Sequence, residues 1–164
     1  EYSFLQIFVF ILDYVIINKN ISNLSDVFII NVGTDQGVTA NMAVIGEEGL
    51  VGHVISATSS TAKVQPIIDA ASGVSGLTSS SRTNVVVRGQ VDSDKELKVY
   101  TLQAEDELVI GDTVETSGLG GIYPKGITIG TIKEIIETKN VTERYAILET
   151  KVDFKNLEYV LVIK

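Results

Sequence analysis

Apolar residues occur along this chain in short runs that are rich in Val, Ile and Tyr and separated by clusters of Gly, Asn, Asp and Ser. Within the runs, β-branched residues dominate or apolar and polar positions alternate, a pattern typical of strands between turns. Roughly a dozen runs recur at intervals of about eight to twelve residues, and helical periodicity is almost absent after Asp13. The pattern predicts an all-β fold of barrels or a sandwich, because the long apolar runs of a parallel sheet are missing.

The order of these runs predicts two small antiparallel β-barrels of six-stranded type, the architecture of chymotrypsin-like proteins. We expect the first barrel in residues 14–78 and the second in 79–164, because a polar stretch of small residues at 69–84 marks a boundary or a crossover. The last run could close either barrel, and closure of the first would make the domains discontinuous. The expected strands are 14–17, 27–32, 42–45, 50–55, 62–68, 85–91, 97–102, 113–117, 127–136, 145–152 and 159–163.

The segment that precedes the first strand, residues 1–13, has a different pattern. Residues 4–12 read FLQIFVFIL, which is too short to span a membrane, since a spanning helix takes about 20 residues. Leu5, Phe8, Val9 and Leu12 have helical spacing, so we expect a short helical stump that is buried or bound to a partner. The start at Glu1 instead of Met suggests a fragment, and the stump is then the end of an upstream helix or coiled coil.

Two segments of the chain resemble each other. GLVGHV begins at Gly49 and GITIGTI at Gly126, and each follows a turn and a strand. In both, one Gly opens the strand and a second, Gly52 or Gly130, lies inside it. Because a Gly inside a strand marks a bulge, a barrel corner or a close backbone approach, the repetition suggests two similar barrels.

Composition and charge restrict the classes of function. The formal net charge is −8, from 21 acidic and 13 basic residues, and no Lys or Arg residues cluster, which disfavours nucleic acid as a partner. The chain has no Cys, so disulfides, thiolate zinc sites and thiol catalysis are excluded. His53 is the single His, too few imidazoles for most transition-metal sites.

Three kinds of chemistry have partial signals in the sequence. A trypsin-like serine protease needs His, Asp and Ser in chain order, which His53, Asp69 or Asp112, and Ser117 supply, but the nucleophile context Gly-Asp-Ser-Gly is missing. The glycines at 118–121 lack the strand-to-helix context of a phosphate-binding loop. Acidic pairs such as Glu47-Glu48 lie in polar turns, where a solvated face is the ordinary interpretation. We therefore expect no enzyme activity and no catalytic residue, cofactor, metal or small-molecule substrate.

The most distinctive stretch, 109–136, reads VIGDTVETSGLGGIYPKGITIGTIKEII. Its loop is dense in Gly and contains a Pro, so its shape is largely fixed by the backbone. This stretch and GLVGHV resemble the signature of the rod shape-determining protein MreC family. The resemblance extends over about residues 14–164 and ends with Asp153-Phe154, Leu157 and Val160-Leu161-Val162. The family-motif positions carried by the resemblance are Gly37, Gly49, Gly52, Gly111, Asp112, Ser117, Gly118, Gly121, Pro124, Gly126 and Gly130.

The resemblance implies a non-enzymatic scaffold that maintains rod cell shape by organising peptidoglycan synthesis in the bacterial elongation complex. It implies a single-pass membrane protein with two β-barrels on the extracytoplasmic side, a dimerising coiled coil upstream, and self-association into dimers or filaments. The implied partners are MreD, RodA and penicillin-binding proteins. We expect contacts at Leu119, Ile122, Tyr123 and Lys125, with Tyr123 as an exposed anchor. An adaptor of an export system remains an alternative function, although the long helical hairpin of that class is missing.

Overall fold

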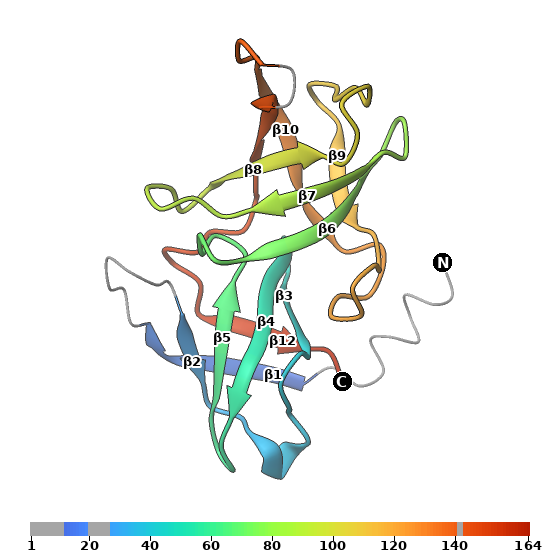
Figure 1. Cartoon of the computed structure of the whole chain (residues 1–164). Helices are drawn as coiled ribbons and strands as arrows, with labels where there is room; N and C mark the ends of the chain where they lie inside the picture. The colour runs from blue at the N-terminus through green and yellow to red at the C-terminus, as the bar shows by residue number, and fades with distance from the viewer. Residues whose placement is uncertain (1–11, 20–26, 141–142) are drawn as a thin grey trace.

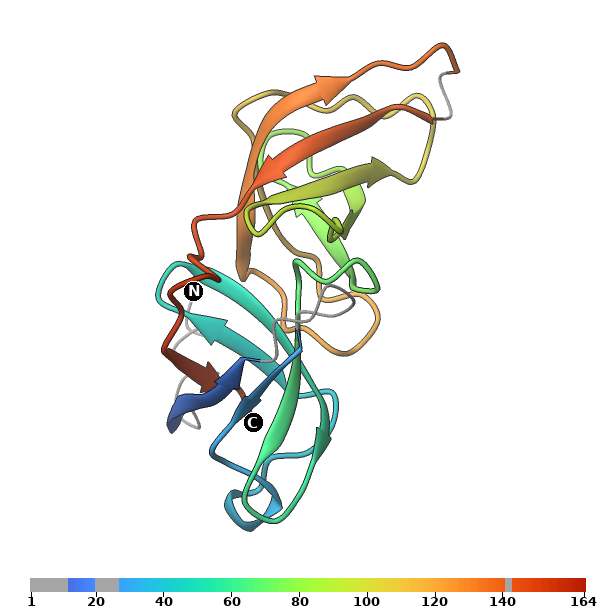
Figure 2. The same cartoon turned by 90° about the vertical axis from the view of Figure 1, so that its left-hand side faces the viewer.

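The structure is a computed structural model, and it describes residues 12–19, 27–140 and 143–164, with side chains from residue 27 onward. This part of the chain forms twelve β-strands and one short 3-10 helix, η1 (Thr34–Gln36). The strands build two closed barrels, one above the other in Figures 1 and 2. The predicted all-β fold of two six-stranded antiparallel barrels is confirmed.

The first barrel contains the two ends of the described chain. Its strands pair in the closed order β1-β12-β3-β4-β5-β2, and every neighbouring pair is antiparallel. Its members are β1 (Leu12–Lys19), β2 (Phe28–Ile30), β3 (Ala43–Gly46), β4 (Gly49–Ala57), β5 (Ala62–Pro66) and β12 (Tyr159–Val162).

The second barrel is formed by one continuous part of the chain and occupies the upper half of Figure 1. Its strands pair in the closed order β10-β11-β8-β7-β6-β9, again antiparallel throughout. Its members are β6 (Gly73–Thr78), β7 (Asn84–Arg88), β8 (Glu96–Thr101), β9 (Thr113–Thr116), β10 (Thr128–Ile136) and β11 (Tyr145–Glu149).

The expected boundary between the barrels at residues 78 and 79 is wrong. Strand β6 lies inside the polar stretch 69–84, which the sequence pattern indicates as a boundary or crossover. Its pairs with β7 and β9 place it in the second barrel, so the division falls between β5 and β6, before residue 79. Strand β12 pairs with β1 and β3, which makes the first barrel discontinuous. The second barrel is thus inserted into the first between β5 and β12.

The two barrels match strand for strand around their closed sheets. The order β1-β12-β3-β4-β5-β2 corresponds to β7-β6-β9-β10-β11-β8, so β12 takes the place in the first barrel that β6 takes in the second. The match extends to register, since Val44 lies opposite Gly52 in one barrel and Val114 opposite Gly130 in the other. Both β4 and β10 also have register shifts against both of their neighbours. The similarity of GLVGHV and GITIGTI therefore reflects equivalent strands.

Alternation of side chains builds the core. In β7 and β11 every second residue is buried, as the period of two in a half-buried strand requires, and β8 follows the same pattern up to Val99. The buried apolar side chains of the two barrels form one contiguous cluster. The barrels therefore pack on each other through apolar contacts as well as through the chain connections.

The helical stump predicted for residues 1–13 falls almost entirely outside the residues that the structure describes. Residues 1–11 lie outside the described part of the chain, whereas Leu12 and Asp13 belong to strand β1. Within the residues that the structure describes, no helix has the length and apolar character needed to cross a membrane.

Candidate interaction surface

The loop 117–127 between β9 and β10 carries most of the site residues predicted from the sequence. Thr116, which is fully buried, ties both ends of this loop together. Its backbone NH donates to Ile127 O (2.8 Å) and its carbonyl accepts from Gly126 N (2.9 Å). Its hydroxyl donates to Pro124 O (2.5 Å) and accepts from Ile127 N (2.9 Å). One buried residue thus fixes the closing half of the loop to the strand in front of it.

Glycine is required at the opening of the loop. Gly118 has a backbone φ of 82°, which residues with a side chain rarely adopt. A Cβ at this position would also lie 3.1 Å from Lys125 Cβ. The amide of Leu119 donates to Ser117 Oγ (3.2 Å) across the same turn. The loop therefore has a defined shape before any partner contacts it, as the sequence predicted.

Tyr123 is buried, so the prediction that it is an exposed anchor is wrong. Only 7 % of its surface is accessible, and its hydroxyl lies 2.8 Å from Nδ1 of His53 on β4. The two rings meet edge to face, with centroids 5.8 Å apart and an interplanar angle of 85°. Burial raises the pKa of Tyr123 and lowers the pKa of His53, so the phenol is protonated and the imidazole neutral at neutral pH. The phenol donates to Nδ1 when the imidazole proton is on Nε2.

This pair joins the two barrels, because Tyr123 belongs to the β9–β10 loop of one and His53 to a strand of the other. A second close approach lies nearby. Gly49, at the start of β4 with φ of 144°, leaves no room for a side chain, since a Cβ would lie 2.5 Å from Thr128 O at the start of β10. Figures 1 and 2 both show the loop reaching toward the first barrel. The loop is held by the first barrel as well as by its own.

The remaining family-motif positions have structural roles in separate places. Asp112 is buried and accepts hydrogen bonds from the hydroxyls of Ser79 (3.4 Å) and Ser80 (2.6 Å), which fasten the turn after β6. Gly111, with φ of 93°, precedes it and donates to Ile132 O (2.8 Å). Gly37, with φ of 83°, ends the helix η1.

Inside the strands, Gly52 and Gly130 are the positions where a neighbouring backbone comes closest. A Cβ at Gly52 would lie 2.0 Å from Gln65 O, and one at Gly130 would lie 2.4 Å from Glu149 O. These distances confirm close backbone approach as the reason for glycine in both strands.

The structure does not bring together the residues weighed for a serine protease. His53 bonds Tyr123, Asp112 bonds two serines of another turn, and Ser117 Oγ accepts the amide of Leu119. Asp69 accepts the amide of Ala71 (2.7 Å) within its own turn. Each group is occupied by a different partner, so these residues do not form the hydrogen-bonded relay that the chemistry requires.

Of the four residues expected at a contact surface, two face solvent. Leu119 is 59 % exposed and Lys125 is also exposed, whereas Ile122 is partly buried against the core and Tyr123 is buried. The loop itself lines a shallow, open hollow of about 550 Å³. The exposed part of the candidate surface is thus the tip at Leu119 together with the Lys125 side chain.

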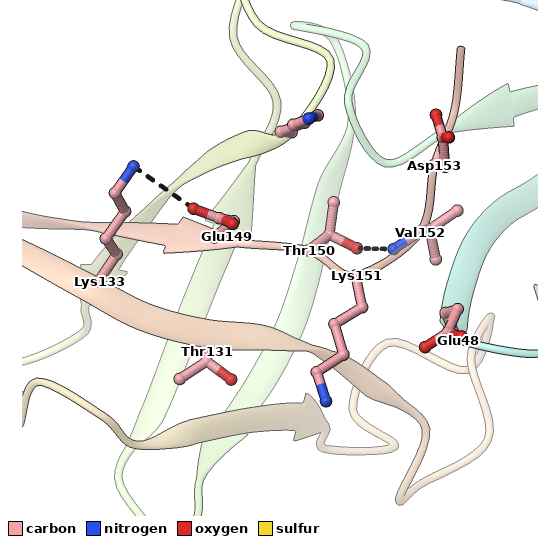
Figure 3. Close-up of a pocket in the computed structure, with 9 residues that line it drawn as sticks. Glu48, Thr131, Lys133, Glu149, Thr150, Lys151, Val152 and Asp153 are labelled. Atoms are coloured by element: carbon pink, nitrogen blue, oxygen red, sulfur yellow. Dashed lines mark hydrogen bonds and ion pairs between the residues drawn. The ribbon is translucent and has the colours of Figure 1, made fainter. Parts of the chain in front are cut away.

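Sequence reasoning missed a polar cleft of about 650 Å³ that lies where the chain returns from the second barrel to the first (Figure 3). On its wall, Lys133 forms ion pairs with Glu96 (2.9 Å) and Glu149 (3.4 Å), and the hydrogen bond that Lys133 donates to Glu96 is the main cause that raises the pKa of Lys133. No three metal-binding side chains cluster anywhere in residues 27–140 and 143–164. The cleft is lined by Glu48, Lys95, Thr131, Lys133, Glu149, Thr150, Lys151, Val152 and Asp153.

Comparison with known families decides what the two barrels are. The model of the family described as "Rod shape-determining protein MreC, barrel core" matches residues 16–164. The chain belongs to the MreC family. The resemblance inferred from the sequence motifs is confirmed, and the MreC match covers both barrels.

Relatives agree with this assignment. The cell shape-determining protein MreC of Listeria monocytogenes is 32 % identical over 152 residues, which cover 91 % of this chain and 52 % of the relative. A solved structure of Listeria monocytogenes MreC is 30 % identical, covers 94 % of this chain and 75 % of that one, and has a TM-score of 0.84. The chain spans about half the length of the curated relatives it matches.

A third neighbour shares the fold and is described as a complex between penicillin-binding protein PBP2 and MreC from Helicobacter pylori. It is 16 % identical, has a TM-score of 0.69, and covers 94 % of this chain and 99 % of that one. At this identity the likeness concerns the fold of the MreC barrels.

Proposed function

We propose that this chain is part of a non-enzymatic scaffold that maintains bacterial cell shape by holding peptidoglycan-synthesis enzymes together. The observation that carries the proposal is the MreC match along 16–164, which includes every strand of the second barrel and all of the first except the start of β1. The rigid joining of the barrels through Tyr123 and Gly49 supports it, because a scaffold needs a surface of fixed shape.

The proposed partners are penicillin-binding proteins, MreD, RodA and further copies of the chain. The first of these is supported by the Helicobacter pylori neighbour, which is described as bound to PBP2. We place the chain on the extracytoplasmic face of the cell membrane, anchored by a segment upstream of the first strand. Because the chain has no Cys, labelling of the variant Val91→Cys in the full-length protein, compared with labelling of the unsubstituted protein, probes this location. Labelling by a membrane-impermeant maleimide in cells with an intact cytoplasmic membrane is expected, and labelling only after lysis would contradict it.

We propose the tip of the β9–β10 loop as the contact surface, with Leu119 and Lys125 as its exposed groups. Leu119→Glu, made in the full-length protein that contains this chain, is expected to fold normally and to lose recovery of penicillin-binding proteins in pull-downs. The matched control is Val91→Glu, which introduces the same charge at a side chain that is 76 % exposed in the second barrel. Equal recovery with both variants would contradict the loop as the surface but leave the scaffold role intact.

Two experiments test the scaffold role and the absence of enzyme activity. Depletion of the full-length protein in a rod-shaped host is expected to produce round cells, and unchanged cell shape would contradict the proposed function. A serine-directed fluorophosphonate is expected to leave Ser117 unlabelled, because no imidazole is hydrogen-bonded to its hydroxyl among the described residues. Labelling of Ser117 that disappears in His53→Gln would show a catalytic site.

A further inference from the structure

A second surface lies on the first barrel, and it borders the closing end of the loop 117–127, because Glu47, Glu48 and Leu161 also line a smaller hollow with Gly126 and Ile127. It is a groove of about 650 Å³ between the β3–β4 turn and the segment that leads into β12. Val152 and Val160 are buried beneath it, Leu157 and Leu161 are partly buried, and Tyr159 is 64 % exposed. The groove is lined by Gly46, Glu47, Glu48, Val152, Asp153, Asn156, Leu157, Glu158, Tyr159, Val160 and Leu161.

The charge on the rim of this groove has one sign. Glu47, Glu48, Asp153 and Glu158 are all exposed, and among the residues whose side chains the structure describes, no Lys, Arg or His lines the groove. None of the four carboxylates forms an ion pair with any of the residues whose side chains the structure describes. Asp153 is held in its ionised form, because the hydrogen bond from the Asn156 side chain (2.8 Å) lowers its pKa.

The polar cleft of Figure 3 adjoins the groove and has a different charge balance. The two hollows share Glu48, Val152 and Asp153, but the cleft also contains three lysines. One of these, Lys133, is neutralised by Glu96 and Glu149. The excess of negative charge over an apolar floor is therefore a property of the groove itself.

We propose that this groove binds a short segment of another protein that carries Lys or Arg together with large apolar side chains. Apolar side chains of such a segment cover Leu157, Leu161 and Tyr159, while its cations meet the carboxylates of the rim. The charges argue against the other occupants. A second copy of the chain carries a net charge of −8, and its own residues 1–11 contain neither Lys nor Arg. Anionic lipid and nucleic-acid phosphates are repelled by the same rim.

The inference rests on one part of the proposed scaffold function, namely that the chain binds other proteins. Its first test uses two synthetic twelve-residue probes of the same apolar pattern, one with Lys and one with Glu at the polar positions. Fluorescence anisotropy is expected to show binding of the Lys probe at least tenfold tighter than binding of the Glu probe, with an affinity that falls as salt rises. Equal affinities would overturn the proposal.

Two triple variants separate the groove from the overall charge of the chain. Glu47→Gln/Glu48→Gln/Glu158→Gln is expected to weaken binding of the Lys probe about tenfold, as the sum of three exposed ion pairs. The control Asp92→Asn/Glu105→Gln/Glu107→Gln removes the same charge from exposed loops of the second barrel and is expected to leave the affinity unchanged. Equal losses in the two variants would show attraction by net charge alone and overturn the site.

A photo-crosslinking amino acid in place of Tyr159, in the full-length protein in cells, tests for a natural occupant. Because Tyr159 is 64 % exposed, the replacement is expected to leave the first barrel folded. Mass spectrometry is expected to identify crosslinked segments that contain Lys or Arg beside apolar residues. Crosslinks to a second copy of the chain, to residues 1–11, to lipid alone or to acidic segments would each overturn the proposal. If cell shape depends on the protein while these crosslinks are missing, the groove is wrong and the scaffold role stands.

Discussion

The hairpin β3–β4 and the hairpin β9–β10 occupy equivalent positions in the two barrels, yet their connections differ. In the first barrel, Glu47 and Glu48 alone join the strands, and both side chains are exposed. In the second, the loop 117–127 extends to the first barrel (Figure 1), and its Tyr123 lies beside His53. The strands themselves keep the same register around Gly52 and Gly130. A repeated scaffold thus acquires different surfaces through the length of one connection, as expected where function is carried by loops on rigid strands.

The largest effect is expected from a methyl group at the equivalent glycines. Gly52→Ala and Gly130→Ala each place a Cβ within 2.4 Å of a carbonyl oxygen of the adjacent strand. Each is expected to lower the free energy of unfolding by about 3 kcal/mol or more, measured by urea denaturation. The control Gly73→Ala, whose Cβ has only Arg88 Nη1 at 3.8 Å, is expected to change it by less than about 0.5 kcal/mol. If only one of the two variants is damaging, the barrels are not equivalent at this position.

The next largest effect is a difference in stability loss between a buried and an exposed residue of the loop 117–127. Tyr123→Ala removes a side chain that is packed between the barrels and is expected to cost about 3 kcal/mol of stability. Leu119→Ala, on the exposed tip of the same loop, is expected to cost less than about 0.5 kcal/mol. Similar losses in thermal denaturation would mean that the tip also packs on the protein in solution.

A double-mutant cycle measures the bond that only the long loop makes. Tyr123→Phe and His53→Phe keep two aromatic rings in contact but remove the hydrogen bond of 2.8 Å. The coupling between the two changes is expected to be about 1 kcal/mol. A coupling near zero in urea denaturation would show that ring packing alone holds the loop to the first barrel.

The smallest effect is a dependence on pH. Burial lowers the pKa of His53 below its ordinary value of 6.5, so near that pH the unfolded chain binds a proton that the folded chain does not. Stability is therefore expected to be level above pH 6.5 and to fall as the pH drops below it. Because His53 is the sole His, His53→Gln is expected to abolish this slope between about pH 5 and 7. A slope of the same size in the variant would assign it to another group.

Local patterning was enough to predict most of the strands but not β6. In β7 and β8, Val85, Val87, Leu97 and Val99 alternate with partly or fully exposed residues, which is the signal that hydrophobic periodicity uses. In β6 the run GVSGLT is weakened by Gly76, which is needed because a Cβ there would lie 2.8 Å from Val114 Cγ1. The close packing of Val114 on β9 and Val85 on β7 explains that glycine, and a short window of sequence does not show packing between strands.

The candidate surface was predicted only in part, again because a short window of sequence does not show contacts between distant residues. The sequence indicated a loop of fixed shape, and the glycine at 118 and the hydrogen bonds of Thr116 are its cause. It did not indicate that Tyr123 turns inward, because its partner, His53, is 70 residues away. From the sequence alone, an aromatic residue in a polar loop is predicted to be exposed, because its contact with the other barrel is not visible there.

The pairing of β1 with β12 has a consequence for how the chain folds during synthesis. Strands β6 to β11 are contiguous, so the ribosome releases a complete second barrel before β12 emerges. Until then β1 and β3 lack the neighbour that separates them, and their free edges are open to pairing with other chains. A truncation in front of β12 is therefore expected to leave the second barrel able to fold while the first exposes two unpaired strand edges, so that β12 protects β1 and β3 from aggregation.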